Sequence, residues 1–233
     1  MKIQIKQLTC EINSHNSLTK TVMLLITFFC LFSCKSQTVI PDVKIKKTAV
    51  VNDTTFVNIK DYNQDFVYDM KYATVDNFLK TKVYDCAECF LRLKTVNAII
   101  EANTEFMKLG YRIKFFDCYR PLDVQKKMWK IVSNPSYVAD PSKGSIHNRG
   151  GAVDITLIDS KGKELDMGTA FDFFGIEAGH NYLNFSSEII KNRALLKQIM
   201  ISKGFNSFDS EWWHYNLKAA LEDKISNTKW NCD

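Results

Sequence analysis

The sequence predicts an α+β fold in which helices flank a central antiparallel sheet. Two long segments, residues 89–109 and 186–204, carry apolar residues at helical spacing. Three short segments have the alternating pattern of half-buried strands: residues 111–117, 152–157 and 212–217. Because helices and short strands follow one another in mixed order, they favour α+β packing around an antiparallel sheet.

The first 55 residues are expected to lie outside this fold. Lysines precede an apolar run from Thr21 to Phe32, which is too short to span a bilayer and has the length of a signal-peptide core. The run ends at Ser33-Cys34 and resembles a bacterial lipoprotein signal with Cys34 as the lipidated mature N-terminus. An ordinary secretory signal is the alternative. We therefore expect a signal peptide (1–33), a polar tether (34–55) and one domain (56–233) on the periplasmic side of a membrane.

Charge and cysteine content narrow the functional classes. Without residues 1–33 the chain has 28 basic and 25 acidic residues, a net charge of +3 with no dense basic block, so nucleic acid is not an expected partner. Cys86-x-x-Cys89 has no second such pair, which argues against a zinc site of four thiolates. In an oxidising compartment the four cysteines beyond Cys34 favour disulfides, with the pairing left open. Cys118 could equally be a buried free thiol.

The elements before the central loop follow from local patterns. Residues 56–70 alternate weakly and are expected to be extended. The first long helix should end at Gly110, and the strand 111–117 follows it. Pro121 is placed to begin a second helix. Residues 133–146 are rich in Ser, Asn, Pro and Gly and predict a loop that leads into His147.

The remaining elements surround two candidate site segments. Gly150-Gly151 ends the loop, and the strand 152–157 follows it. Asp154 should face away from Val153 and Ile155 in that strand. Ser186-Ser187 should start the last long helix and Gly204 should stop it. The segment from Trp212 to Leu217 is then the closing strand.

His147, Asp154 and His214 are the candidate ligands of one catalytic zinc ion. Zinc binds two imidazoles and a carboxylate well, and a catalytic site keeps the fourth position open for water, whose pKa falls to about 7. His147 lies seven residues before Asp154, an offset that would oppose them on a regular strand, so we expect the glycines to turn the backbone. His180 lacks such a setting and is expected to be structural or at the rim.

Glu211 and Arg120 are the candidate catalytic residues. Glu211 could take a proton from water and deliver it to a leaving amine; the alternative is a surface Glu beside a core strand. A three-residue offset on a regular strand would separate Glu211 from His214, so we expect Glu211 in a turn before the strand. Arg120 could stabilise an oxyanion, and its alternative is a surface salt bridge.

Five motifs in order resemble the D-alanyl-D-alanine dipeptidase family of zinc peptidases. They are Lys-Tyr-Ala-Thr-x-Asp-Asn-Phe (71–78), Tyr-Arg-Pro (119–121), Ser-x-His-x-x-Gly-x-Ala-x-Asp (145–154), Met-Gly-Thr-Ala-Phe-Asp-Phe (167–173) and Glu-x-x-His (211–214). The resemblance implies the compact α+β zinc-peptidase fold shared with Hedgehog-type domains, one zinc ion per chain, and the roles given above. It also implies that Asp172 and Tyr72 hold a substrate ammonium and that Ser145 lies near the substrate carboxylate. Asp172 as a helix cap is the alternative.

The expected function is therefore zinc-dependent hydrolysis of D-alanyl-D-alanine, in cell-wall peptide turnover or glycopeptide tolerance. A site that binds both a free ammonium and a free carboxylate selects for length, because a longer peptide would leave buried charges unpaired. One alternative is a zinc D,D-carboxypeptidase that acts on peptidoglycan stems. Another is a cell-wall-binding lipoprotein that holds zinc without catalysis, although Glu211 argues against it because a structural site needs no base.

Overall fold

A computed structural model describes residues 52–232. The predicted signal peptide, the lipid anchor at Cys34 and most of the predicted tether lie outside the described residues. Short 3₁₀ turns connect the following main elements: β1 (Phe56–Asn58), β2 (Val67–Tyr68), β3 (Phe90–Arg92), α1 (Leu93–Lys108), β4 (Arg112–Asp117), α2 (Leu122–Ile131), β5 (Ala152–Ile158), α3 (Ser187–Ser202), β6 (Phe205–Phe208) and β7 (Glu211–Leu217).

The central sheet has five strands in the order β2-β4-β5-β7-β6, and a second sheet pairs β1 with β3. All pairs in the central sheet are antiparallel except β2 with β4, which is parallel. The predicted α+β class with a central antiparallel sheet is confirmed, with β2 as the one parallel edge strand. Every residue of β5, in the middle of the sheet, is buried.

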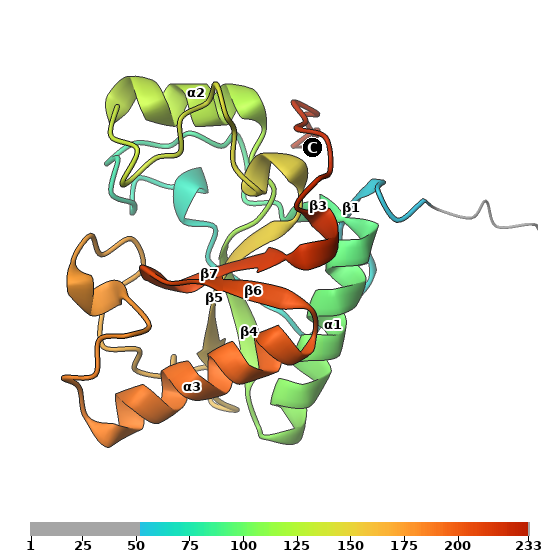
Figure 1. The fold of residues 1–233 in the computed structure, drawn as a ribbon. Coiled ribbons are helices and arrows are strands. Elements are labelled where there is room, and N and C mark those ends of the chain that lie inside the picture. Colours follow the sequence, from blue (N-terminus) through green and yellow to red (C-terminus); the bar gives the residue numbers. More distant parts are fainter. Residues whose placement is uncertain (1–51, 233) are drawn as a thin grey trace, which may run out of the picture. The chain divides into compact units, whose positions relative to one another are not determined.

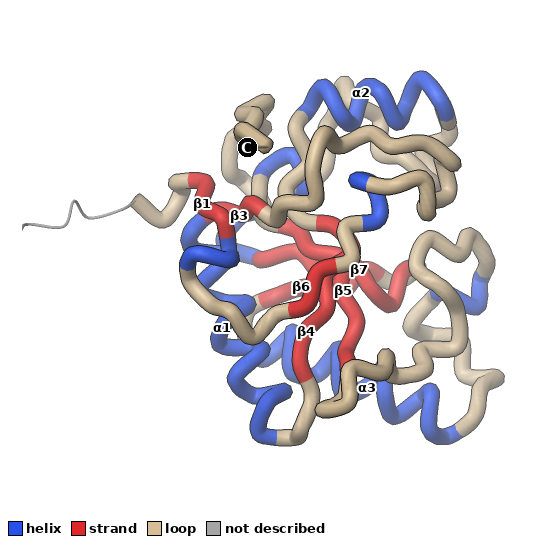
Figure 2. The backbone as a smooth tube through the Cα atoms, turned by 180° about the vertical axis from the view of Figure 1, so that it is seen from behind, coloured by secondary structure: helices blue, strands red, loops and turns tan. Residues whose placement is uncertain are grey.

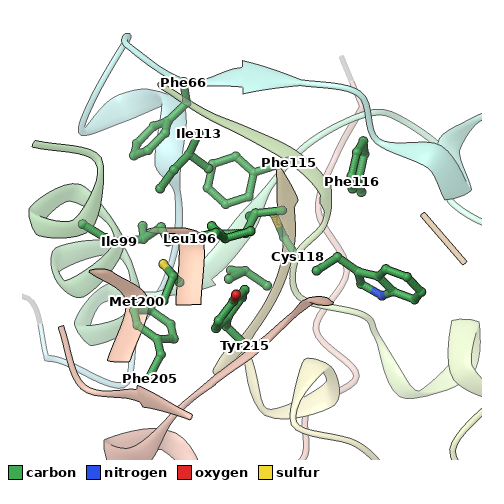
Figure 3. Close-up of a cluster of buried hydrophobic side chains, with 14 of the residues drawn as sticks. Phe66, Ile99, Ile113, Phe115, Phe116, Cys118, Leu196, Met200, Phe205 and Tyr215 are labelled. Atoms are coloured by element: carbon green, nitrogen blue, oxygen red, sulfur yellow. The ribbon is translucent and has the colours of Figure 1, made fainter. Parts of the chain in front are cut away.

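Helices α1 and α3 pack together against the central sheet (Figure 1). Their apolar faces meet the strand side chains in the main core (Figure 3), where Ile99, Leu196 and Met200 lie near Phe115 and Tyr215. Burial of these side chains is the main driving force for the fold. Gly110 and Gly204 follow the two helices in the left-handed conformation, as predicted for residues that end them.

Helix α2 lies at the opposite end of the domain from α3 (Figure 2). It packs through Val124 and Met128 into a second, smaller apolar cluster that includes Tyr72, Tyr84 and Val138. Through Tyr72, this cluster also borders the cavity that the candidate site residues share. It therefore forms one wall of the region where the candidate site residues gather.

Two strands differ from the prediction. Residues 90–92 were expected in a helix but form β3, because they pair with Phe56–Asn58 far away in sequence. Residues 205–208 were not predicted as a strand and form β6, the partner of β7. Both are short, and both are stabilised by non-local pairing that a local pattern does not reveal.

Two disulfides lie in this domain, Cys86–Cys232 and Cys89–Cys118. The first ties the C-terminal segment beside β1 and β3 (Figure 1). The second pairs Cys118, so the free-thiol alternative is wrong. Among the described helices, none combines the length and the hydropathy needed to cross a bilayer.

Candidate active site

Asp154 and His214 are cross-strand partners on adjacent antiparallel strands. Asp154 is the third residue of β5 and His214 the fourth of β7, and they are directly opposite in the register. Side chains of such a pair share one face of the sheet. His214 Nδ1 accordingly lies 2.9 Å from Asp154 Oδ1.

His147 reaches the same point from a tight turn. It begins a 3₁₀ turn, His147–Arg149, that ends at Gly150 in the left-handed conformation (φ 71°). A Cβ on Gly150 would collide with the ring of Phe56, so glycine is required for both conformation and space. His147 Nε2 lies 3.4 Å from Asp154 Oδ2 and 3.2 Å from His214 Nδ1. The turn expected from the glycines is present.

The hydrogen bonds of the two imidazoles set which nitrogen of each ring faces inward. His147 Nδ1 donates to the carbonyl oxygen of Cys118 (2.6 Å), and His214 Nε2 donates to Asn216 Oδ1 (2.9 Å). In the neutral rings, His147 Nε2 and His214 Nδ1 therefore present lone pairs to each other and to a carboxylate. Such a cluster of acceptors is suited to hold a cation between them.

The donor set fits zinc. The three ligand atoms of His147, Asp154 and His214 all lie within 4.8 Å of one another. Two imidazole nitrogens and one carboxylate, each imidazole oriented by a hydrogen bond from its other nitrogen, are the usual ligands of a catalytic zinc ion. Burial of Asp154 opposes ionisation, but the charge and hydrogen bonds that the imidazoles of His147 and His214 offer in their protonated form outweigh it and hold the pKa of Asp154 well below its usual range.

Glu211 enters the site through an irregularity in β7. The register shifts between Ser207 and Phe208, which pair with Tyr215 and Glu211, so residues 212–214 have no partners on β6. The bulge breaks the alternation and places Glu211 Oε2 4.0 Å from His214 Nδ1. The prediction that Glu211 precedes the strand in a turn is wrong, since it is the first residue of β7. Burial raises the pKa of the Glu211 carboxyl.

Arg120 is held by a buried network. Its Nε and Nη2 donate to Asp117 Oδ2 (3.2 and 2.7 Å), and its Nη1 donates to Gln125 Oε1 (2.9 Å). Asp117 is fully buried and Arg120 is 7% exposed, so the surface salt bridge considered as an alternative is wrong. Asp117 also accepts from the hydroxyl of Tyr84 (2.6 Å). Three of the five guanidinium N–H groups are occupied, and two remain for a ligand.

Asp172 and Tyr72 form a second polar pair in the cavity. The Tyr72 hydroxyl donates to Asp172 Oδ2 over 2.9 Å. Asp172 has a left-handed backbone (φ 57°), and the next helical turn begins after Gly175, so the helix-cap alternative is wrong. Burial first, and then the charge of Asp154, raise the pKa of the Asp172 carboxyl well above its usual value.

All eight predicted site residues line one cavity of about 540 Å³. They are Tyr72, Arg120, Ser145, His147, Asp154, Asp172, Glu211 and His214. Ser145 lies at the entry to the His147 turn, where its backbone N–H donates to Asn148 Oδ1. His180 does not line this cavity. The structure thus gathers every predicted site residue in one place.

A family model described as D-ala-D-ala dipeptidase matches residues 52–231, most of the chain. The chain belongs to the D-alanyl-D-alanine dipeptidase family of M15 peptidases. A D-alanyl-D-alanine dipeptidase of Escherichia coli is 32% identical over 78% of this chain and 95% of that protein. One from Enterococcus faecalis is 30% identical over 70% of this chain and 90% of that protein. M15 peptidases are zinc enzymes, in agreement with the donor set.

Solved structures share a looser likeness with this dipeptidase family member. The LdcB LD-carboxypeptidase superposes with a TM-score of 0.38 at 20% identity, over 56% of this chain and 62% of that chain.

Several residues that build this M15 site were not singled out from the sequence. Asp117 holds Arg120, Asn216 orients His214, and the backbone of Cys118 orients His147. Trp213 lines the cavity beside them. Asp117 had a detectable signal, because an acid three residues before an Arg at the end of a strand can pair with it. A backbone carbonyl leaves no signal in the sequence at all.

Proposed function

We propose that this protein hydrolyses D-alanyl-D-alanine to two D-alanines, with a zinc ion held by His147, Asp154 and His214. The observation that carries the proposal is the cluster of two inward lone pairs and one carboxylate within 4.8 Å, with Glu211 beside it in a cavity. Membership in the dipeptidase family supports the choice of substrate. A zinc ion bound there supplies Lewis-acid chemistry, which polarises a carbonyl and makes water more acidic.

The residues of the chain supply the remaining steps. Glu211 takes the proton from the attacking water and delivers it to the leaving amine. Arg120 presents its two unoccupied N–H groups to the oxyanion that develops as the carbonyl is attacked. Asp117 and Gln125 fix the guanidinium before substrate arrives, so little reorganisation is needed during the reaction.

The two ends of the dipeptide are recognised by opposite charges. Asp172, with Tyr72, holds the free ammonium, and Ser145 lies near the free carboxylate. A stem peptide has no free ammonium at the matching position, so its binding would leave the buried Asp172 carboxyl group without the cationic partner that favours its ionised form. The D,D-carboxypeptidase alternative shares the zinc chemistry and differs at this end of the cavity.

We also propose that the protein is exported and anchored on the periplasmic side of a membrane through a lipid at Cys34. Two disulfides within the described domain support an oxidising compartment. Fractionation of cells that express the wild type and Cys34→Ala tests the anchor. The wild type should be in the membrane fraction and the variant released from it; equal partition of the two would contradict lipidation.

The catalytic proposal is tested with Glu211→Gln, which keeps the shape of the side chain and removes the base. We expect turnover of D-alanyl-D-alanine to fall by about 10²–10⁴-fold while the zinc content is retained. Glu188→Gln, on an exposed carboxylate of α3, is the matched control and should keep full activity. If Glu211→Gln turns over like the wild type, the alternative of zinc binding without catalysis is favoured.

A comparison of substrates separates the dipeptidase from the carboxypeptidase. The free dipeptide and a stem pentapeptide that ends in D-alanyl-D-alanine are assayed with the same zinc-loaded protein. We expect a higher kcat/KM for the dipeptide, and Asp172→Asn should reduce it selectively. A clear preference for the pentapeptide would overturn the dipeptidase proposal.

A further inference from the structure

We propose that the Cys89–Cys118 disulfide is a positioning element of the active site, which holds the Cys118 backbone against the zinc ligand His147. The inference rests on the proposed zinc site and adds a requirement to it. Both cysteines are fully buried, and Cys118 lies among the side chains of the main core (Figure 3). Neither sulfur is thus available to react with solvent or substrate, and the bond acts only through the backbone that it joins.

The segment after β4 needs support from outside the central sheet. Pairing of β4 with β5 shifts register after Phe115 and ends with Asp117 opposite Asp154. Cys118 is the next residue and has no partner in that ladder. Its carbonyl oxygen accepts instead from His147 Nδ1 over 2.6 Å. The acceptor that orients a metal ligand therefore lies one residue beyond the end of the sheet.

Residues 118–120 hold His147 at two points. Cys118 accepts from the imidazole, and the backbone N–H of Arg120 donates to the carbonyl oxygen of His147 over 3.1 Å. A shift of this short segment would therefore move the ligand and the oxyanion-binding Arg120 together. His147 Nδ1 also lies 3.7 Å from Asp117 Oδ2. If the Cys118 carbonyl moved away, that carboxylate would become the competing acceptor and turn the ring from its position.

The other half of the disulfide supports the far end of the same turn. Cys89 immediately precedes β3, and Arg92 in β3 donates its backbone N–H to the carbonyl oxygen of Gly150 over 3.1 Å. Thr95, in the first turn of α1, donates its hydroxyl to the same oxygen over 2.9 Å. The disulfide thus joins the two sheets. It links residues 118–120, which hold His147, covalently to the segment of β3 and α1 that holds Gly150.

The second disulfide provides a matched control. Cys86–Cys232 ties the C-terminal segment, and Cys232 is exposed. It spans 146 residues of sequence against 29 for Cys89–Cys118. By chain entropy, loss of the longer crosslink destabilises the fold at least as much. A purely structural role therefore predicts that both losses affect the protein alike, whereas a positioning role predicts a selective effect on the metal.

The test measures the zinc dissociation constant by competition with a chromophoric chelator. The full chain, produced in an oxidising compartment, is compared with Cys89→Ala/Cys118→Ala and with Cys86→Ala/Cys232→Ala, and thermal unfolding of each zinc-free protein is recorded. We expect zinc affinity to weaken by about 10-fold or more in the first variant and by less than about twofold in the second. Cys89→Val/Cys118→Ala, which fills the space of the sulfurs, replaces the first variant if that one does not fold.

The outcomes separate this inference from the proposed function. The positioning role would be overturned if the Cys89→Ala/Cys118→Ala variant bound zinc as tightly as the wild type. It would also be overturned if both disulfide variants lost zinc affinity equally. Failure of the wild type itself to bind zinc would instead overturn the proposed zinc site.

Discussion

Substitution of Asp117 by Asn should destabilise the protein more than a single surface change can. Asp117 is fully buried and is the only carboxylate within ion-pairing distance of Arg120 among the described residues. Asn keeps the shape and can still accept from Tyr84 and from the Cys118 N–H through one oxygen. It replaces Oδ2, which receives two guanidinium N–H groups, and leaves the charge of Arg120 buried without a counter-ion.

Loss of one partner from a buried ion pair typically costs about 3–5 kcal/mol, a large part of the stability of a typical domain. We expect Asp117→Asn to lower the free energy of unfolding by that amount. Urea unfolding of the zinc-free protein is the measurement, because bound metal would add its own stabilisation. Glu105→Gln, which breaks surface ion pairs with Lys108 and Lys203, is the control and should change little. A loss below about 1 kcal/mol for Asp117→Asn would refute the claim that this pair neutralises a buried charge.

Two contacts around the site and one buried histidine can each be tested by a single substitution. Gly150→Ala would place a Cβ on a left-handed backbone and against the ring of Phe56. The melting temperature should therefore fall by at least about 2–4 °C in calorimetry, and an unchanged value would show that the position tolerates a side chain. Asn216→Ala removes the oxygen that accepts a hydrogen bond from His214 Nε2. It should weaken zinc binding by about 10–100-fold in chelator competition, and unchanged affinity would contradict the orientation assigned to the His214 ring. Burial first, then Lys197 and Arg193, lower the pKa of His180 to about 4. His180 takes up a proton near pH 6.5 in the unfolded chain and only near pH 4 in the folded chain. The free energy of unfolding should therefore decline as the pH falls from 6.5 to 4. His180→Gln should flatten this decline in unfolding curves recorded across that pH range. An identical pH dependence in the variant would exclude His180 as the cause.

The candidate site could be predicted where its chemistry depends on side chains. His147 and His214 were identified because only three histidines follow the leader, Asp154 because it comes just after Gly150-Gly151, and Gly150 signalled the turn that makes the odd spacing possible. Glu211 lines the cavity as predicted, but its predicted place in a turn before the strand was wrong. That prediction assumed that β7 alternates regularly. The bulge in β7 arises from pairing with β6, a strand whose own sequence gave little indication of it.

The fold could be predicted where local periodicity governs it, as in α1, α3, β4 and β5. It could not be predicted where distant segments meet. β3 forms only because β1 lies beside it, and the disulfide partners of Cys86 and Cys89 depend on where the C-terminus and the end of β4 lie in space. Such contacts depend on tertiary packing, which overrides the preferences of short segments.

The turn that follows β5 points to a use for this molecule as a laboratory reagent. Residues 159–163 are closed by a hydrogen bond from the Asp159 N–H to the carbonyl oxygen of Lys163, and the tip at Lys161 and Gly162 is exposed. At about 3.3 Å per residue along a strand, the base of this turn at Asp159 lies roughly 16 Å from Asp154, and the tip lies beyond it. Exposed tips of this kind tolerate inserted sequence. A fluorophore or an affinity peptide inserted there should allow the protein to be tracked or immobilised while its catalytic cavity stays intact.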